Sequence, residues 1–262
     1  MTSTSGQIRR EDADGVLTLT FTRDDKLNSL TDEMLAVIRQ AVDDLGDDED
    51  LRVLVITAEG RYFTAGMDVG RFGADAHRPT SGVAIRRDYR RVHVLFDELE
   101  SIEKPVILGA QGPCLGAGVE MAVSCDFRFA SERTVFGLPE ITNLALIPGS
   151  GGISRLTRIV GPHWARWLAM AGERIDADEA LRIGLVHRVL PGDNFAAEVQ
   201  GFARRLTGLS REALGLAKVA IDAAASIDRT SARNVDRIAN TLLLTSSEHR
   251  DAVAAFQARK RG

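Results

Sequence analysis

Short apolar strands alternate with amphipathic helices over the first 190 residues, and this alternation restricts the possible folds more than any other feature of the chain. The segment 16–21 (VLTLTF) alternates in polarity and is rich in β-branched residues, as strands are. The segment 51–57 (LRVLVIT) is apolar enough to be buried on both faces of a sheet. Further strands are predicted at 106–110 (VILGA), 127–130 (FRFA) and 186–190 (VHRVL). We therefore expect an α/β fold.

Two helices between these strands are marked by capping residues and apolar spacing. Thr31 can cap a helix whose first turn carries Asp32 and Glu33, and Gly46 is expected to end it. The apolar face of this helix consists of Met34, Leu35, Ile38, Ala41, Val42 and Leu45. A second helix is predicted over 83–102, with an apolar face that consists of Ile85, Tyr89, Val92, Phe96 and Leu99.

The C-terminal part of the sequence differs from the first part because it is mostly helical from about residue 153. No low-complexity linker separates the two parts. We expect an α/β core over residues 1–195 and a helical region over residues 196–262. The apolar helices of this second region fit a subunit interface, and they could equally cover their own core.

The composition excludes several classes of protein. With 33 basic and 37 acidic residues, the net charge of −4 gives no electrostatic footprint for nucleic acid. Hydrophobic residues make up 44% of the chain, enough for a substantial core, yet no apolar run of about 18 residues predicts a membrane span. The first 15 residues lack an apolar h-region, so we expect no secretory signal. Two cysteines, Cys114 and Cys125, are too few for a disulfide framework and favour a reducing cytoplasm.

The common cofactor motifs are missing. A dinucleotide-binding G-x-G-x-x-G begins at Gly116 and Gly118, but Met121 stands where its last glycine should be. No phosphate-binding P-loop is present, and Pro148 occupies the first glycine position of a G-x-S-x-G nucleophile motif. The five histidines are scattered without metal-ligand spacing. The sequence therefore indicates neither NAD, ATP nor metal chemistry.

A first candidate site segment, GRYFTAGMDV (60–69), follows the buried strand at 51–57. It therefore lies at the carboxyl end of a β-element, where α/β proteins bind ligands. The small pair Ala65-Gly66 would let a ligand approach the main chain closely. A tight turn that needs a small residue explains this pair equally well.

A second segment, GPCLGAGVEMA (112–122), joins the strand at 106–110 to a short helix. Its small residues expose N–H groups at a helix N-terminus, which suits developing negative charge. Ala117 and Glu120 are three residues apart, so an N–H donor and a carboxyl could point into one cleft. Glu120 stands in an apolar run, which favours burial over the alternative of a partly exposed surface glutamate.

A third segment comprises FGLPE (136–140) and IPGSGG (147–152). Glu140 lies between Pro139 and Ile141, an unusual place for a solvated charge. A glutamate that serves the dipole at a helix N-terminus is an equally good interpretation.

Taken together, these segments resemble the enoyl-CoA hydratase/isomerase (crotonase) family over nearly the whole chain. The resemblance is carried by KLNSL (26–30), AGMD (65–68), LGAGVE (115–120), FGLPE (136–140), IPGSGG (147–152), ALRIGLVHRVLP (180–191) and the AAFQARK tail. It implies a crotonase-like spiral of ββα turns with a C-terminal α-helical region for trimerisation. It also implies a homotrimer or a dimer of trimers.

The resemblance assigns four catalytic positions. The main-chain N–H groups of Met67 and Ala117 would form an oxyanion hole for a thioester oxygen. Many relatives have glycine at 117, and alanine donates the same N–H if its φ is negative. Glu120 is expected to activate water and Glu140 to protonate the α-carbon. Two carboxyls that share a water in a dry cleft should titrate apart, so that one stays ionised while the other keeps its proton.

The resemblance also implies where coenzyme A would bind. Lys26 and Leu27 match the part that lines the adenine and pantetheine in relatives, and Ala65, Gly66 and Asp68 border the same channel. In the tail, Phe256 and Arg259 match positions that help close the CoA site, often from a neighbouring subunit, although the end of a basic amphipathic helix explains them nearly as well. The arginines at 86, 87, 90 and 91 could meet phosphates or form a solvated helix face. The loop over 70–85 is expected to shape the acyl pocket.

The implied activity is hydration of a trans-2-enoyl-CoA to the 3-hydroxyacyl-CoA, a lyase reaction of the kind used in fatty acid β-oxidation. No metal or redox cofactor is needed, since coenzyme A is part of the substrate. A Δ3-Δ2 enoyl-CoA isomerase is the nearest alternative, followed by other reactions of the family. Isomerases of the family can manage with the second glutamate alone, so Glu120 favours hydration. A CoA-binding scaffold without turnover is a further alternative, against which both glutamates argue.

Overall fold

The strands of the protein form two sheets within the part of the chain that the computed structural model describes, residues 2–72 and 81–260. The larger sheet has seven strands in the order β1 (Thr2–Ser5), β2 (Ile8–Ala13), β3 (Val16–Phe21), β4 (Val53–Ala58), β5 (Val106–Ala110), β7 (Phe127–Ser131) and β10 (Arg188–Leu190). The first three strands pair antiparallel, and the others continue parallel to β3. The smaller sheet consists of β6 (Cys114–Leu115), β8 (Val135–Gly137) and β9 (Arg174–Asp176).

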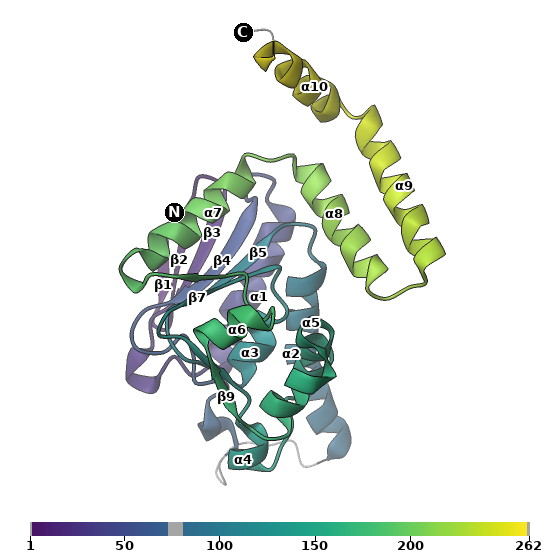
Figure 1. The fold of residues 1–262 in the computed structure, drawn as a ribbon. Helices are drawn as coiled ribbons and strands as arrows, with labels where there is room; N and C mark the ends of the chain where they lie inside the picture. Colours follow the sequence, from purple (N-terminus) through teal and green to yellow (C-terminus); the bar gives the residue numbers. More distant parts are fainter. Residues whose placement is uncertain (1, 73–80, 261–262) are drawn as a thin grey trace.

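Helices cover both faces of the large sheet and continue beyond it at the C-terminal end (Figure 1). They are α1 (Asp32–Asp47), α2 (Gly82–Ser101), α3 (Ala117–Ala122), α4 (Glu140–Leu144), α5 (Gly152–Ala169), α6 (Ala177–Arg182), α7 (Phe195–Thr207), α8 (Arg211–Ala224), α9 (Arg229–Thr245) and α10 (Ser247–Arg259). Short 3-10 turns occur at Asp24–Lys26, Val69–Phe72 and Gly192–Asn194. The predicted α/β class is confirmed.

The core lies on both sides of β4, as the apolar sequence of this strand predicts. Leu54 and Ile56 belong to the larger apolar cluster, which also contains the buried faces of α1, α2 and α3. Val53 and Val55 point to the opposite face, where α7 packs against the sheet. All six apolar residues predicted for the inner face of α1 are buried, and the Thr31 hydroxyl caps this helix. The side chains at successive positions of the strand thus alternate between two separate cores.

Several elements differ from the sequence-based expectation. β1 and β2 precede the strand predicted as the first, and the sequence IRREDA of β2 is too charged to read as a strand. Gly46 does not end α1, which continues to Asp47. In α2 the spacing is helical throughout, but Ile85 and Tyr89 are exposed because the first turns of this helix lie beyond the core.

The parallel strands β4 and β5 send the loops that follow them to the same edge of the sheet. There the two loops pair directly, with a parallel bridge between Thr64 and Cys114. A second parallel bridge, between Leu30 and Met67, adds the segment that precedes α1. Three segments that are distant in sequence are therefore held side by side by main-chain hydrogen bonds.

The last helices leave the body of the molecule. α9 and α10 project away from it, with the C-terminus at the far end (Figure 1). α8 and α9 each bury a single small residue, and α10 buries none. Exposed apolar side chains on these helices include Ile221, Ile238, Leu242, Leu244 and Phe256. The expected division of the chain near residue 195 stays a prediction.

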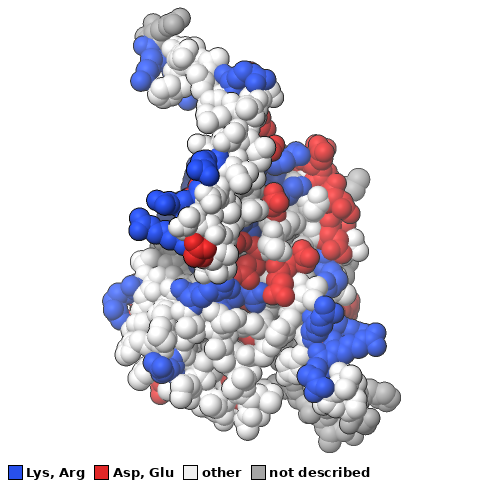
Figure 2. All heavy atoms as spheres, turned by 90° about the vertical axis from the view of Figure 1, so that its right-hand side faces the viewer, with Lys and Arg blue, Asp and Glu red and all other residues white. Residues whose placement is uncertain are grey.

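The surface carries both signs of charge. On the face shown in Figure 2, basic and acidic side chains both occur, and much of the projecting helical arm carries neither. A search of the described helices finds none that is long and apolar enough to cross a membrane.

Candidate functional site

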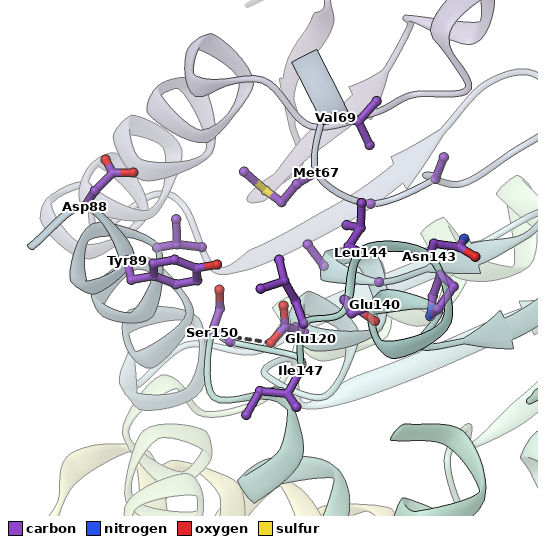
Figure 3. A pocket seen from close by; sticks show the side chains of 18 residues that line it. Met67, Val69, Asp88, Tyr89, Glu120, Glu140, Asn143, Leu144, Ile147 and Ser150 are labelled. Carbon is purple, nitrogen blue, oxygen red and sulfur yellow. Dashed lines mark hydrogen bonds between the residues drawn. The ribbon is translucent and has the colours of Figure 1, made fainter. Parts of the chain in front are cut away.

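A pocket of about 180 Å³ opens at the edge where the loops after β4 and β5 meet. Its wall comes from five parts of the chain, namely the loop after β4, α2, α3, α4 and the loop before α5 (Figure 3). The lining consists of Ala65, Gly66, Met67, Val69, Asp88, Tyr89, Val92, Gly116, Ala117, Glu120, Pro139, Glu140, Asn143, Leu144, Leu146, Ile147, Gly149 and Ser150. Six residues predicted from the sequence are among them: Ala65, Gly66, Met67, Ala117, Glu120 and Glu140.

Met67 and Ala117 present main-chain N–H groups at this pocket. The bridge to Leu30 uses the Gly66 carbonyl (2.8 Å) and the Asp68 N–H (2.9 Å) and leaves the Met67 N–H out. Ala117 is the first residue of α3, so its N–H has no acceptor within the helix, and its φ is negative as expected. Among residues 2–72 and 81–260, neither N–H has a hydrogen-bond acceptor. Two unused donors, one in the loop after β4 and one at the N-terminus of α3, suit an oxyanion.

The close approach of these two segments depends on glycine. At Gly66, where φ is +96°, a Cβ atom would lie 3.0 Å from the Leu115 carbonyl oxygen and 3.4 Å from the Ala117 nitrogen. Gly116 has φ 55° and ψ −124°, a conformation that residues with a side chain rarely adopt. Its N–H donates to the Gly137 carbonyl at 2.9 Å. The small residues noted in the sequence thus bring the two N–H donors to one place.

Two buried polar side chains, neither of them expected from the sequence to have this role, hold the loop after β4. The Thr64 hydroxyl donates to the Asn28 carbonyl (2.7 Å) and accepts from the Gly66 N–H (3.1 Å). The Asn28 amide donates to the carbonyls of Glu59 (2.9 Å) and Tyr62 (2.8 Å). Asn28 and Thr64 have no exposed surface. The asparagine of KLNSL was the available signal for this structural role.

Glu120 projects from α3 into the pocket with 3% of its surface exposed. Its Oε1 accepts from the main-chain N–H groups of Ser150 (2.7 Å) and Gly152 (3.2 Å). Burial raises the pKa of this carboxyl, while the two N–H donors and the charges of His93 and Arg155 oppose the rise. The expectation of a buried Glu120 is confirmed, and the carboxylate is held by the main chain.

Glu140 is the first residue of α4 and faces the same pocket. Burial, together with a smaller effect of the charge of Glu120, raises the pKa of its carboxyl to about 7, while its own N–H opposes the shift. Its Oε2 is buried and has no hydrogen-bond partner in the part of the chain that the structure describes. A carboxyl with this pKa exchanges its proton near neutral pH, as an acid–base catalyst needs to.

The arrangement joins two kinds of chemistry at one place. Two free N–H donors can stabilise negative charge on an oxygen, and two carboxyls can accept and donate protons beside it. The interaction between Glu120 and Glu140 raises the cost of ionising both at once. This combination suits a reaction that passes through an enolate-like state.

The remaining predicted residues do not line the pocket. Asp68 is turned away and pairs with Arg23 (Oδ2 to Nη1, 2.8 Å), which holds the pKa of the Asp68 carboxyl below its usual value. Lys26 is exposed, and Leu27 is partly buried, with its carbonyl accepting from the Ala65 N–H (3.0 Å). Phe256 and Arg259 lie on α10, which projects away from the pocket (Figure 1).

Sequence reasoning also missed part of the pocket wall. Tyr89 was expected in the core but lines the pocket, and Leu144 and Ile147 add apolar surface to it (Figure 3). The N–H donors of Ser150 and Gly152 lie in the motif IPGSGG, but main-chain donors leave no side-chain signal in a sequence. Of the loop over 70–85 that was expected to shape the acyl pocket, residues 73–80 lie outside the described residues.

A metal site is not apparent in the described chain. Residues 2–72 and 81–260 contain no group of three or more His, Cys, Asp or Glu side chains that could hold a metal ion. Cys114 and Cys125 are both buried and free.

Comparison with known proteins places this geometry in context. The family model for enoyl-CoA hydratase/isomerase matches residues 11–261. Crotonyl-CoA hydratase of Syntrophomonas wolfei is 32% identical over 239 residues, covering 91% of this chain and 90% of that protein. The 1,2-epoxyphenylacetyl-CoA isomerase of Escherichia coli is 32% identical over 248 residues, covering 94% of this chain and 93% of that protein. The crystal structure of an enoyl-CoA hydratase from Bacillus anthracis matches with a TM-score of 0.89 at 28% identity, over 97% of this chain and 96% of that one. The crotonase-type fold predicted from the motifs is confirmed.

Proposed function

Because the chain belongs to the enoyl-CoA hydratase/isomerase family, we propose that it hydrates a trans-2-enoyl-CoA thioester to the 3-hydroxyacyl-CoA. One observation carries this proposal. The buried carboxyl of Glu120, the partly buried carboxyl of Glu140 and two main-chain N–H groups without an acceptor among the described residues line a single pocket. The apolar wall of the same pocket, including Val92 and Ile147, suits an acyl chain.

The N–H groups of Met67 and Ala117 bind the thioester oxygen in this mechanism. As water adds to the conjugated double bond, negative charge develops on that oxygen. One such donor contributes about 3 kcal/mol to stabilisation of the transition state in comparable sites. Both donors are fixed by their loops before substrate arrives, so little reorganisation is needed.

Glu120 acts as the base and Glu140 as the acid. The two main-chain N–H bonds on Glu120 Oε1 favour its ionised form and leave Oε2 for the attacking water. The raised pKa of Glu140, about 7, lets it hold the proton that it delivers to the α-carbon. After the reaction Glu120 has gained the proton of the water and Glu140 has lost its own, and proton exchange restores both.

Isomerisation is the second candidate, because relatives of similar identity carry the names 1,2-epoxyphenylacetyl-CoA isomerase and enoyl-CoA isomerase/hydratase. Hydration is favoured here because Glu120 is buried, held by two N–H donors and directed at the pocket. A CoA-binding scaffold without turnover would have no need for two such carboxyls. Coenzyme A is then part of the substrate, and the mechanism uses no other cofactor.

The rest of coenzyme A and the assembly belong to the same proposal. Lys26, Leu27 and Asp68 would border the channel that binds coenzyme A. Leu27 contacts the loop after β4 through the Ala65 N–H, and Asp68 lies in that loop and pairs with Arg23. Phe256 and Arg259 would complete the CoA site of a neighbouring subunit, since α10 projects away from the pocket of its own chain. The exposed apolar side chains of α8–α10 would then be covered in a homotrimer or a dimer of trimers. The buried free thiols fit a cytoplasmic enzyme.

A turnover assay on enoyl-CoA thioesters of graded chain length tests this proposal. Loss of the conjugated thioester absorbance measures hydration, with Glu120→Gln and Glu140→Gln as the variants. Each should lower kcat by at least about 10²-fold, the lower range for lost acid–base catalysis. Glu132→Gln, an exposed glutamate on the turn between β7 and β8, is the matched control and should keep the wild-type rate. Wild-type rates in both pocket variants would refute the assignment.

A further inference from the structure

The carboxylate of Glu120 is held by a loop that has little rigidity of its own. The loop consists of residues 149–152 (GSGG), and its Ser150 and Gly152 N–H groups donate to Glu120 Oε1. Three of its four residues are glycine, and Gly151 has φ +84°. Such a segment can adopt many conformations, so contacts from outside must select the one that aims both N–H groups at Glu120.

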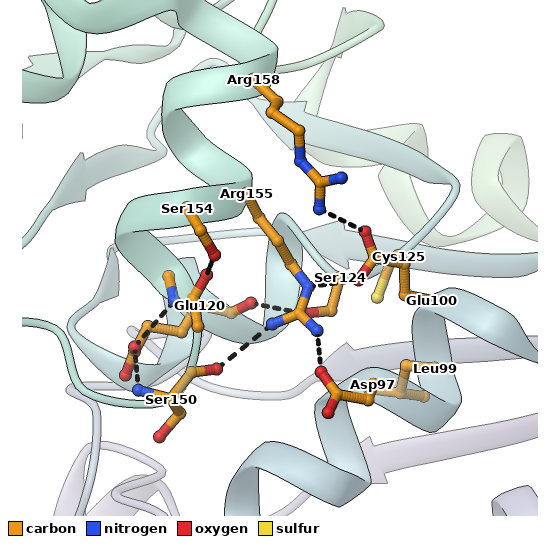
Figure 4. A network of polar contacts seen from close by, with 12 residues as sticks. Asp97, Leu99, Glu100, Glu120, Ser124, Cys125, Ser150, Ser154, Arg155 and Arg158 are labelled. Atoms are coloured by element: carbon orange, nitrogen blue, oxygen red, sulfur yellow. Dashed lines mark hydrogen bonds and ion pairs between the residues drawn. The ribbon is translucent and has the colours of Figure 1, made fainter. Parts of the chain in front are cut away.

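Arg155, in the first turn of α5, makes such a contact (Figure 4). Its Nη1 donates to the Ser150 carbonyl at 3.2 Å. This carbonyl belongs to the peptide unit that lies between the two N–H donors. The guanidinium also packs against Gly151. A Cβ atom at that position would lie 2.3 Å from Nη1 of Arg155, so the loop and the side chain fit closely. Only 5% of the Arg155 side chain is exposed.

Two carboxylates of α2 fix the guanidinium in turn. Arg155 Nε donates to Glu100 Oε2 at 2.6 Å, and Nη2 donates to Asp97 Oδ1 (Figure 4). Three nitrogens of one planar group therefore reach three acceptors, which a lysine could not do. His93, also on α2, contacts the Gly149 carbonyl, and this peptide unit carries the Ser150 N–H. Helix α2 thus acts on the loop directly through His93 and, by way of Arg155, through Asp97 and Glu100.

We propose that Arg155 is a positioning residue for Glu120, which holds the 149–152 loop in the one conformation that directs the Ser150 and Gly152 N–H groups at the carboxylate. This inference rests on the proposed function, and it adds how Glu120, the proposed base of the reaction, is held in position. Arg155 does not line the pocket and touches no reacting atom. The charged groups that interact with Glu120 are His93 from α2, Arg155 from α5 and Glu140 from α4.

The test compares Arg155→Met, Arg155→Lys and the control Arg158→Gln. Arg158 lies one turn further along α5 and pairs with the same Glu100 (3.1 Å), but it does not contact the loop. We expect Arg155→Met to lower kcat at least about 10-fold, with KM changed less than about 3-fold, because positioning of the base is lost while substrate contacts remain. Arg155→Lys should recover part of kcat. Arg158→Gln should stay within about 2-fold of the wild type.

A second readout separates positioning from general destabilisation. Titration of the Glu120 carboxyl by NMR with 13C-labelled glutamate, assigned by its absence in Glu120→Gln, should give a higher pKa in Arg155→Met and an unchanged one in Arg158→Gln. The rise is expected because Arg155→Met removes both a positive charge near Glu120 and the contact that holds the loop with the two N–H donors. Arg155→Lys keeps the positive charge, so the pKa of the Glu120 carboxyl should rise less in this variant than in Arg155→Met.

The outcomes decide the proposal in each case. A folded Arg155→Met protein with wild-type kcat and wild-type titration of Glu120 overturns it, as does an equal loss in Arg155→Met and Arg158→Gln. If Arg155→Met does not fold, Arg155→Lys against Arg158→Lys carries the test, and equal kcat values in the two overturn the proposal. Full activity of Glu120→Gln would instead refute the proposed function, while the titration still reports whether Arg155 acts on Glu120.

Discussion

Replacement of Gly152 by alanine should disable the site without a direct change to any catalytic group. Gly152 begins α5, and a Cβ atom there would lie 2.5 Å from Glu120 Cγ and 2.7 Å from its Oε1. Ordinary contacts of a Cβ atom begin at 3.4 Å, so the carboxyl must retreat by about 1 Å. Gly152 does not have a positive φ, so alanine brings no backbone strain at this position.

The expected cost can be worked from that displacement. A misplacement of about 1 Å in a catalytic group lowers the rate about 10²-fold, so we predict a fall in kcat of this size in Gly152→Ala. KM should change much less, since the acyl wall and the N–H groups of Met67 and Ala117 stay in place. The assay is hydration of an enoyl-CoA followed by loss of the conjugated thioester absorbance, with thermal unfolding of the same protein.

Gly201→Ala provides the matched control. Gly201 also lies in a helix, α7, and a Cβ there meets no atom within 4 Å. Alanine should stabilise this helix by up to about 1 kcal/mol and leave kcat unchanged. A folded Gly152→Ala protein with the kcat of Gly201→Ala would refute the reasoning, because the glutamate would then not need the position that the structure gives it.

Two further predictions concern proton binding and assembly. Burial raises the pKa of Glu140 from 4.5 to about 7 in the folded protein, so the fold binds this proton more tightly than the unfolded chain does. The wild type should therefore lose stability relative to Glu140→Gln as pH rises from 4.5 to about 7. Thermal unfolding of both proteins at several pH values in this range measures the difference in their stabilities. A difference that stays constant with pH would contradict the prediction. Light scattering should find a trimer or hexamer, and Leu242→Asp together with Ile238→Asp on the exposed face of α9 should yield smaller species. A monomeric wild type would contradict the assembly.

Much of the fold could be predicted because burial leaves a periodic signal. The six apolar residues of α1 and the alternating Val and Leu of β4 are buried as their spacing indicates. β2 could not be predicted in this way, since it is held by main-chain pairing and its Arg10 binds Asp12 and Asp44 at the surface. Ile85 and Tyr89 have the spacing of core residues, but they lie on a part of α2 that has no sheet beneath it.

The candidate site, like the fold, could be predicted only in part from the sequence. A charged residue in an apolar run marks Glu120, and the structure buries it as expected. Glu120 is held by main-chain N–H donors, and these are positioned in turn by Arg155, which donates to the Ser150 carbonyl. Neither the main-chain donors nor the arginine has a local sequence pattern that points to the glutamate. Phe256 and Arg259 lie on α10, which buries none of its residues, and the contact proposed for them with a neighbouring subunit stays a prediction.

Hydration in isotopically heavy water tests the central claim most directly. With a short trans-2-enoyl-CoA in 18O-labelled water, mass spectrometry should find the heavy oxygen in the hydroxyl group of a 3-hydroxyacyl-CoA. Conversion should be absent when both Glu120 and Glu140 are glutamine. A product of unchanged mass with a shifted double bond, or label incorporated at the same rate by the double variant, would contradict the account.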